Sequence, residues 1–231
     1  MSRSLIFLHG GPGYADYMQR FFVGRFQAQF ECVFYSQKQK QLNGVEDLIL
    51  ELADHVSAQG DQVYLVGHSW GGALAAEYLR RTQDPRVRGL VLLGAFLCEA
   101  DATIEYRKEL ADLGWESPSL EQIFLAPDEA KVAGSFIQEL NTTFNLEVFN
   151  KLWSELVTSG FDAREFVRSI QIPVLNIFGE YDVRIPSRCV RRYKELSSNV
   201  TNFEIAKAGH FPFFLGTNRD AVVERIESWI R

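Results

Sequence analysis

The sequence has few cysteines and no long hydrophobic run. Its three cysteines, Cys32, Cys98 and Cys189, are widely spaced and form no Cys-x-x-Cys pair. The sequence therefore indicates neither a disulfide framework nor a zinc knuckle. The first apolar run, residues 5–8, is far too short for a signal sequence or a membrane span. We expect a cytoplasmic protein without a membrane-spanning segment.

Basic residues are also in deficit. The chain has 24 Lys and Arg against 30 Asp and Glu, a net charge of −6, whereas nucleic-acid binding needs a basic footprint that neutralises phosphates. No His-Glu-x-x-His pattern is present, and no cluster of histidine, cysteine and acidic residues has the spacing of metal ligands. We therefore expect no nucleic-acid partner, no metal and no cofactor.

The apolar content is ample for a core. Of the 231 residues, 46% are hydrophobic and 13% aromatic, which suits one large domain or a domain with an insertion. Short apolar runs alternate with helical patterns, and this alternation predicts an α/β fold with a mostly parallel sheet covered by helices on both faces. Six strands are expected, at residues 4–8, 32–35, 63–66, 87–94, 172–179 and 202–206.

The alternation stops between Phe96 and Gln171. These residues have helical patterns and no convincing strand, so we predict an α/β core of residues 1–95 and 172–231 and a helical cap of residues 96–171, inserted after the fourth strand. The cap carries 14 acidic and 6 basic residues, a net charge of −8, while the remainder is +2. Its tryptophans and phenylalanines suit a lid that packs onto a cleft.

The most specific motif is Gly67-His68-Ser69-Trp70-Gly71, between the third strand and a run of good helix formers. In a Gly-x-Ser-x-Gly turn at such a corner, the serine is strained and its hydroxyl rises above the sheet. Glycines let the chain double back without a Cβ clash. An ordinary glycine-rich loop is the alternative, but the flanking strand and helix favour a nucleophile elbow at Ser69.

A second glycine motif, His9-Gly10-Gly11-Pro12-Gly13, follows the first strand. Three glycines within five residues let main-chain N–H groups approach a ligand closely, as an oxyanion hole requires. A simple turn is the alternative interpretation of this motif when it is taken alone.

A serine nucleophile needs a base that takes its proton. Of the four histidines, His9 and His68 belong to the glycine motifs and His55 lies on a predicted helix. The fourth, His210, follows the sixth strand in a loop, where parallel sheets place catalytic groups. His210 is therefore the candidate base.

The base needs a carboxylate that orients it. Asp182 follows the fifth strand at the same edge of the sheet and is the favoured candidate. Glu180 in the same turn, and Glu99 and Asp101 after the fourth strand, are the alternatives. The resulting chain order of serine, acid and histidine is that of one particular architecture.

The chain resembles the α/β-hydrolase superfamily from the first glycine motif to the final helix. The resemblance implies that Ser69 is the nucleophile, that His210 is the general base and acid, and that Asp182 holds the imidazole tautomer. It also implies an oxyanion hole formed by the backbone N–H groups of Gly11 and Trp70.

Both glycine motifs are more particularly similar to those of the proline iminopeptidase branch. Residues 34–37 also resemble the Tyr-Asp-Gln of that branch, with Ser36 as a departure. The family normally has two strands before the first glycine motif, which this chain lacks, so we expect six strands with Cys32 to Tyr35 at an edge. The cap is shorter than in those peptidases, and its acidic residues do not align with the ones that bind the substrate's amino group.

We expect a serine hydrolase that cleaves a small-molecule ester or amide through an acyl-enzyme, as a monomer or weak homodimer. A carboxylesterase-like activity is slightly favoured, since esters need less leaving-group activation. The acidic cap favours the alternative of a proline iminopeptidase-like aminopeptidase, because carboxylates attract a protonated amine, although solvated helix faces would carry the same charge. A ligand-binding receptor with little turnover is the alternative of another class.

Overall fold

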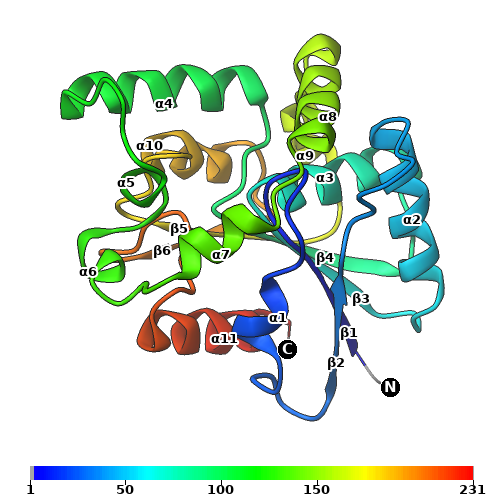
Figure 1. The fold of residues 1–231 in the computed structure, drawn as a ribbon. Coiled ribbons are helices and arrows are strands. Elements are labelled where there is room, and N and C mark those ends of the chain that lie inside the picture. The colour runs from blue at the N-terminus through cyan, green and yellow to red at the C-terminus, as the bar shows by residue number, and fades with distance from the viewer. Residues whose placement is uncertain (1–2, 231) are drawn as a thin grey trace.

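A six-stranded sheet forms the centre of the computed structural model, which describes residues 3–230 (Figure 1). Every neighbouring pair is parallel, and the strand order is β2-β1-β3-β4-β5-β6. The strands are β1 (Arg3–Leu8), β2 (Phe30–Tyr35), β3 (Val63–His68), β4 (Val87–Leu93), β5 (Val174–Gly179) and β6 (Val200–Ile205). The predicted six-stranded sheet is confirmed, and the strand at residues 30–35 lies at an edge as expected.

Helices cover both faces of the sheet, which is why the inner strands are nearly continuous apolar runs. One face packs against α2 and α3, and the other against α1 and α11. The edge strands β2 and β6 are only partly buried along their middles. The helices outside the insertion are α1 (Met18–Phe22), α2 (Val45–Ser57), α3 (Trp70–Thr82), α10 (Ser187–Val190), the 3₁₀ helix η1 (Arg191–Glu195) and α11 (Gly216–Ile230).

Residues 94–173, which we call the inserted segment, separate β4 from β5 and contribute no strand to the sheet. In Figure 1 the inserted segment runs from α4 across one side of the molecule to α8 and α9. Its helices are α4 (Glu99–Leu113), α5 (Leu120–Phe124), α6 (Pro127–Ala130), α7 (Phe136–Thr142), α8 (Leu146–Ser159) and α9 (Arg164–Ser169).

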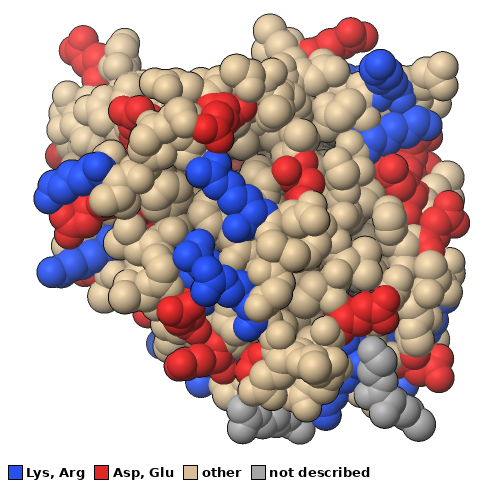
Figure 2. Space-filling model, turned by 60° about the horizontal axis from the view of Figure 1, so that its bottom comes forward, with Lys and Arg blue, Asp and Glu red and all other residues tan. Residues whose placement is uncertain are grey.

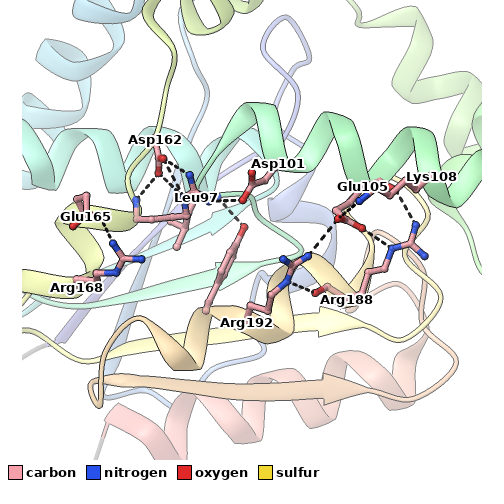
Figure 3. A network of polar contacts seen from close by, with 11 residues as sticks. Leu97, Asp101, Glu105, Lys108, Asp162, Glu165, Arg168, Arg188 and Arg192 are labelled. Carbon is pink, nitrogen blue, oxygen red and sulfur yellow. Dashed lines mark hydrogen bonds and ion pairs between the residues drawn. The ribbon is translucent and has the colours of Figure 1, made fainter.

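Ion pairs join α4 to neighbouring elements (Figure 3). Arg188 of α10 lies 2.7 Å from Glu105, and Arg192 of η1 lies 3.3 Å from the same carboxylate. Arg164 of α9 contacts Asp101 at the start of α4. Because the arginines of these pairs are partly solvated, each pair stabilises the fold by no more than about 1 kcal/mol. Their main effect is to fix where α4 lies and to engage several acidic residues of the inserted segment.

The surface carries charges of both signs. On the face shown in Figure 2, acidic and basic side chains are interspersed among uncharged residues and form no continuous patch of one sign. Within residues 3–230, none of the helices combines the length and the apolar character that crossing a membrane would need.

Candidate active site

Ser69 lies at the corner between β3 and α3. Its backbone angles, φ +51° and ψ −117°, belong to a region that residues other than glycine rarely occupy. A Cβ at Gly67 would lie 2.5 Å from the backbone of Gly71, and a Cβ at Gly71 would lie 2.2 Å from the carbonyl oxygen of Leu8. The tight turn therefore requires both glycines, and it has the strained geometry of a nucleophile elbow.

His210 and Asp182 form a buried pair next to this corner. The Nδ1 atom of His210 lies 2.9 Å from the Oδ2 atom of Asp182, and the two residues are only 3% and 2% exposed. The other carboxylate oxygen of Asp182 accepts the N–H of Ile185 at 2.8 Å, which fixes the turn after β5. The ring of Phe124 stacks on the imidazole at 5.5 Å between centroids. The hydrogen bond to Asp182 and the stacking on Phe124 together fix the orientation of the His210 imidazole.

The three alternative carboxylates have other partners. Glu180 accepts the N–H of Lys207 at 2.9 Å, Glu99 accepts the hydroxyl of Thr103 at 2.6 Å, and Asp101 pairs with an arginine. Asp182 is therefore the one of the four candidates that contacts His210. This geometry favours the first choice made from the sequence.

A chain of hydrogen bonds links the first glycine motif to the His210 loop. The Gly10 N–H donates to the Tyr17 hydroxyl at 2.7 Å, and that hydroxyl donates in turn to Nδ1 of His68. The opposite ring nitrogen of His68 donates to the carbonyl of His210 at 2.8 Å. Burial, with a smaller contribution from the nearby His210, lowers the pKa of His68 far below its usual value. A neutral His68 therefore connects the first glycine motif to the His210 loop through hydrogen bonds at both ring nitrogens.

Gln37 supports the same region from the end of β2. Its backbone N–H donates to Nε2 of His9 at 3.2 Å, and its side-chain amide donates to the His9 carbonyl at 3.0 Å. The indole N–H of Trp70 donates to the Gln37 side-chain oxygen at 3.0 Å. Burial lowers the pKa of His9 to about 4, so its Nε2 atom is available as an acceptor. Gln37 thus ties the two glycine motifs together.

The two predicted oxyanion donors lie on either side of Ser69 in the sequence, at Gly11 and at Trp70. Within residues 3–230, the backbone N–H groups of Gly11 and Trp70 have no hydrogen-bond acceptor. Gly11 has a φ of +62°, which a residue with a Cβ adopts only with strain. Both residues line the same cavity as Ser69 and His210. This arrangement can bind an oxyanion that forms at a carbon attacked by Ser69.

Glu129 of α6 holds the His210 loop from the other side. Its fully buried carboxylate accepts the N–H of Ala126 at 2.8 Å and the N–H of Gly209 at 3.0 Å. The His210 N–H donates to the Phe124 carbonyl at 2.8 Å. The inserted segment is therefore bonded directly to the loop that carries the histidine. Burial raises the pKa of Glu129 to about 7.

This raised pKa predicts a pH-dependent stability. The folded protein binds more protons than the unfolded chain between the usual pKa of 4.5 and about 7, so the free energy of unfolding falls as pH rises through this window. The fall amounts to about 3 kcal/mol, from 1.4 kcal/mol for each unit. Glu129→Gln stays neutral and keeps an acceptor, so this contribution should be absent in urea unfolding measured between about pH 5 and pH 8.

The matched control is Glu121→Gln, which changes an exposed carboxylate on the neighbouring helix α5. We expect the control to keep the pH profile of the unchanged protein. Parallel profiles for the Glu129 variant and the unchanged protein would show that Glu129 ionises normally.

Ser69 and His210 open into one cavity of about 340 Å³. Its walls are predominantly apolar, and the inserted segment supplies most of the aromatic side chains. Among residues 3–230, Arg184 is the one lysine or arginine that lines it, and no aspartate or glutamate does. The carboxylates of the inserted segment lie elsewhere: Asp101 and Glu105 pair with arginines, Glu99 accepts from Thr103, and Glu129 is buried against the His210 loop. The inserted segment's contribution to the walls includes Phe96, Leu120, Phe124, Leu140, Phe144, Phe149 and Trp153.

Four residues of this region were not identified from the sequence. Tyr17, Glu129 and Arg184 carry no motif of their own, and His68 was assigned only to its glycine motif. Their contacts join segments far apart in the chain, so local pattern gives no signal for them. The site residues expected from the sequence lie together: Ser69, His210, Gly11 and Trp70 line the cavity, and Asp182 lies behind His210.

Comparison with known proteins gives matches along nearly the whole chain. The model of the Alpha/beta hydrolase family matches residues 5–225. A Mycoplasma pneumoniae protein, whose name places it among esterases and lipases, is 25% identical over 228 residues, which are 91% of this chain and 83% of that protein. The proline iminopeptidase of Neisseria meningitidis is 32% identical over 134 residues, which are 53% of this chain but 42% of the peptidase.

Solved structures give the same fold. A thermophilic esterase from Thermogutta terrifontis superposes with a TM-score of 0.76 over 100% of this chain and 90% of that chain, at 18% sequence identity. An esterase from Exiguobacterium antarcticum superposes with a TM-score of 0.74 over 99% of this chain and 92% of that chain, also at 18% identity. At this level of identity, the likeness concerns the fold alone.

Proposed function

The chain belongs to the alpha/beta hydrolase family, and on that premise we propose that it is a serine hydrolase acting on a small-molecule ester. The observation that carries the proposal is the buried His210–Asp182 pair, whose imidazole opens into the same cavity as Ser69 on its strained turn. Residues 96–171 act as a cap that encloses the substrate, over a core formed by residues 1–95 and 172–231.

The proposed mechanism follows from the protonation of His210. Because Nδ1 faces the carboxylate of Asp182, Nδ1 carries the proton and Nε2 keeps its lone pair. Nε2 takes the proton of the Ser69 hydroxyl as the serine oxygen attacks the ester carbonyl carbon. The N–H groups of Gly11 and Trp70 stabilise the resulting oxyanion.

Collapse of this tetrahedral intermediate breaks the ester bond. The alcohol leaves with the proton held by His210, and an acyl group remains on Ser69. A water molecule then attacks the acyl carbon, with His210 again acting as the base, and releases the carboxylic acid. Asp182 keeps the imidazole in one tautomer and stabilises its protonated form during both steps.

Three observations support an ester over an N-terminal proline amide. No aspartate or glutamate of the part of the chain that the structure describes lines the cavity, so no carboxylate there pairs with a protonated amine. Asp101 and Glu105 of α4, both labelled in Figure 3, pair with arginines instead. The Mycoplasma pneumoniae relative, which matches 91% of this chain, is named as an esterase or lipase. The iminopeptidase similarity supports the aminopeptidase as the second candidate, but it extends over less than half of that enzyme.

A side-by-side assay tests this ranking. Purified protein is given 4-nitrophenyl butyrate and proline 4-nitroanilide under the same conditions, and release of the chromophore is followed. We expect kcat/KM for the ester to exceed that for the arylamide by at least about tenfold. Preference for the arylamide would instead identify an aminopeptidase, and the absence of turnover with either substrate would favour the receptor alternative.

A further inference from the structure

Arg184 is placed unusually for an arginine. It lies in the loop between β5 and α10, two residues after Asp182, and it lines the cavity that contains Ser69. Its guanidinium carbon lies 5.2 Å from the ring centroid of Tyr106 on α4 and 5.5 Å from that of Trp153 on α8. The two aromatic rings thus hold the guanidinium group in the cavity wall.

Arg184 makes no ion pair and no hydrogen bond with a carboxylate within residues 3–230, although Asp182 and Glu99 lie near enough for their charges to raise its pKa slightly against the effect of burial. The nearby acids are engaged elsewhere, since Asp182 contacts His210 and Glu99 accepts from Thr103. Arg188, only four residues further on, pairs with Glu105 (Figure 3). The contrast shows that acidic partners are abundant around α4, yet Arg184 lacks one.

Holding an arginine in an apolar wall without an ion-pair partner costs free energy. Burial lowers the pKa of Arg184, but a guanidinium remains protonated in proteins. Contact with aromatic faces stabilises the cation and leaves the in-plane N–H groups free to donate. That planar set of donors matches the two oxygens of a carboxylate. The cavity therefore combines the nucleophile Ser69 with a group at Arg184 that can bind an anion.

We propose that Arg184 binds a free carboxylate of the substrate, so that the preferred substrates are small esters that also carry a carboxylate. This inference rests on the proposed serine hydrolase function and names its substrate class. Water cleaves the ester bond to an alcohol and a second carboxylic acid, while the carboxylate at Arg184 is held and not changed. The carboxylate lies on the acyl part or on the alcohol part of the ester.

Matched pairs of esters test the inference in the unchanged protein. The monoethyl esters of succinate, glutarate and adipate are each compared with the ester in which a primary carboxamide replaces the carboxylate. The pair of 4-acetoxybenzoate and 4-acetoxybenzamide places the charge on the alcohol part. With hydrolysis followed by pH-stat, we expect kcat/KM to be roughly 10- to 100-fold higher for the carboxylate in at least one pair.

Variants then assign this preference to Arg184. In Arg184→Gln, the ratio of kcat/KM between the two members of the preferred pair should fall to about one, and Arg184→Lys should keep part of it because one cation remains. Arg107→Gln is the matched control, since Arg107 is exposed on α4 next to Tyr106. The control should keep both the activity and the preference.

The outcomes test carboxylate binding by Arg184 separately from the proposed serine hydrolase function. Equal rates within every pair, or a preference that survives in Arg184→Gln, would overturn carboxylate binding while leaving a serine hydrolase in place. If neither member of any pair is hydrolysed, the proposed function itself fails. If Arg184→Gln lowers both rates equally and also lowers the Tm, Arg184 is a tether between α4 and α8, and the inference is wrong.

Discussion

Replacing Ser69 with alanine is expected to lower kcat for ester hydrolysis by a factor on the order of 10⁶, the loss that follows when the nucleophile of a serine hydrolase is removed. The Oγ atom of Ser69 makes no hydrogen bond within residues 3–230, so its loss should cost the fold little. Alanine keeps the same Cβ in the strained turn. The measurement is steady-state hydrolysis of 4-nitrophenyl butyrate, with thermal unfolding recorded in parallel.

Ser57→Ala is the matched control, because Ser57 is an exposed serine at the end of α2. It should hydrolyse the ester at the unchanged rate. If Ser69→Ala retained a tenth or more of the activity with a normal Tm, the nucleophile would have to be another residue.

Asp182→Asn is expected to lower kcat by a factor on the order of 10⁴, the effect of the equivalent change in a Ser-His-Asp protease. The asparagine amide can donate to Nδ1 of His210, and this favours the tautomer that carries its proton on Nε2. That tautomer cannot accept the proton of Ser69. The side-chain oxygen of asparagine can still accept the N–H of Ile185, so the turn after β5 should stay in place. The measurement is kcat near neutral pH.

The control for this variant is Glu180→Gln in the same turn. Glu180 is bonded to the Lys207 N–H and does not contact His210, so kcat should change by no more than a few-fold. An unchanged kcat in Asp182→Asn would move the orienting role to Glu99, Asp101 or Glu180.

The sheet was predictable because its signal is local. Runs such as residues 4–8 and 174–178 are buried on both faces, so they are apolar except for Ser4 and Asn176 and are recognisable without knowledge of their neighbours. The turn at Ser69 was predictable for a related reason. Part of the steric constraint acts within five residues, since a Cβ at Gly67 would meet Gly71, and glycines at fixed positions are its visible consequence.

The supporting contacts were not predictable, because each joins distant segments. His68 reaches the carbonyl of His210 across 142 positions of sequence, and Glu129 reaches the N–H of Gly209 across 80. A sequence pattern gives residue types at short range and says nothing about which side chains meet after folding. Tyr17 and Arg184 are ordinary residues in their local sequence for the same reason.

The positions of the charged side chains were not predictable from the sequence either. The sequence revealed a net charge of −8 in residues 96–171, and this favoured an amine-binding cap as one interpretation. The direction of each carboxylate depends on the packing of α4, which turns Glu105 and Asp101 toward arginines of α10, η1 and α9. The inserted segment consequently contributes aromatic side chains to the cavity wall. Among residues 3–230, Arg184 is the one charged lysine, arginine, aspartate or glutamate in that wall.

Covalent labelling tests the central claim, a catalytic Ser69, most directly. The protein is treated with a fluorophosphonate, digested, and analysed by mass spectrometry while ester hydrolysis is followed in the same sample. We predict one adduct per chain, located on Ser69, with loss of hydrolysis in proportion to labelling, and no adduct in Ser69→Ala. An adduct on another residue, or full hydrolysis by protein labelled at Ser69, would contradict the account.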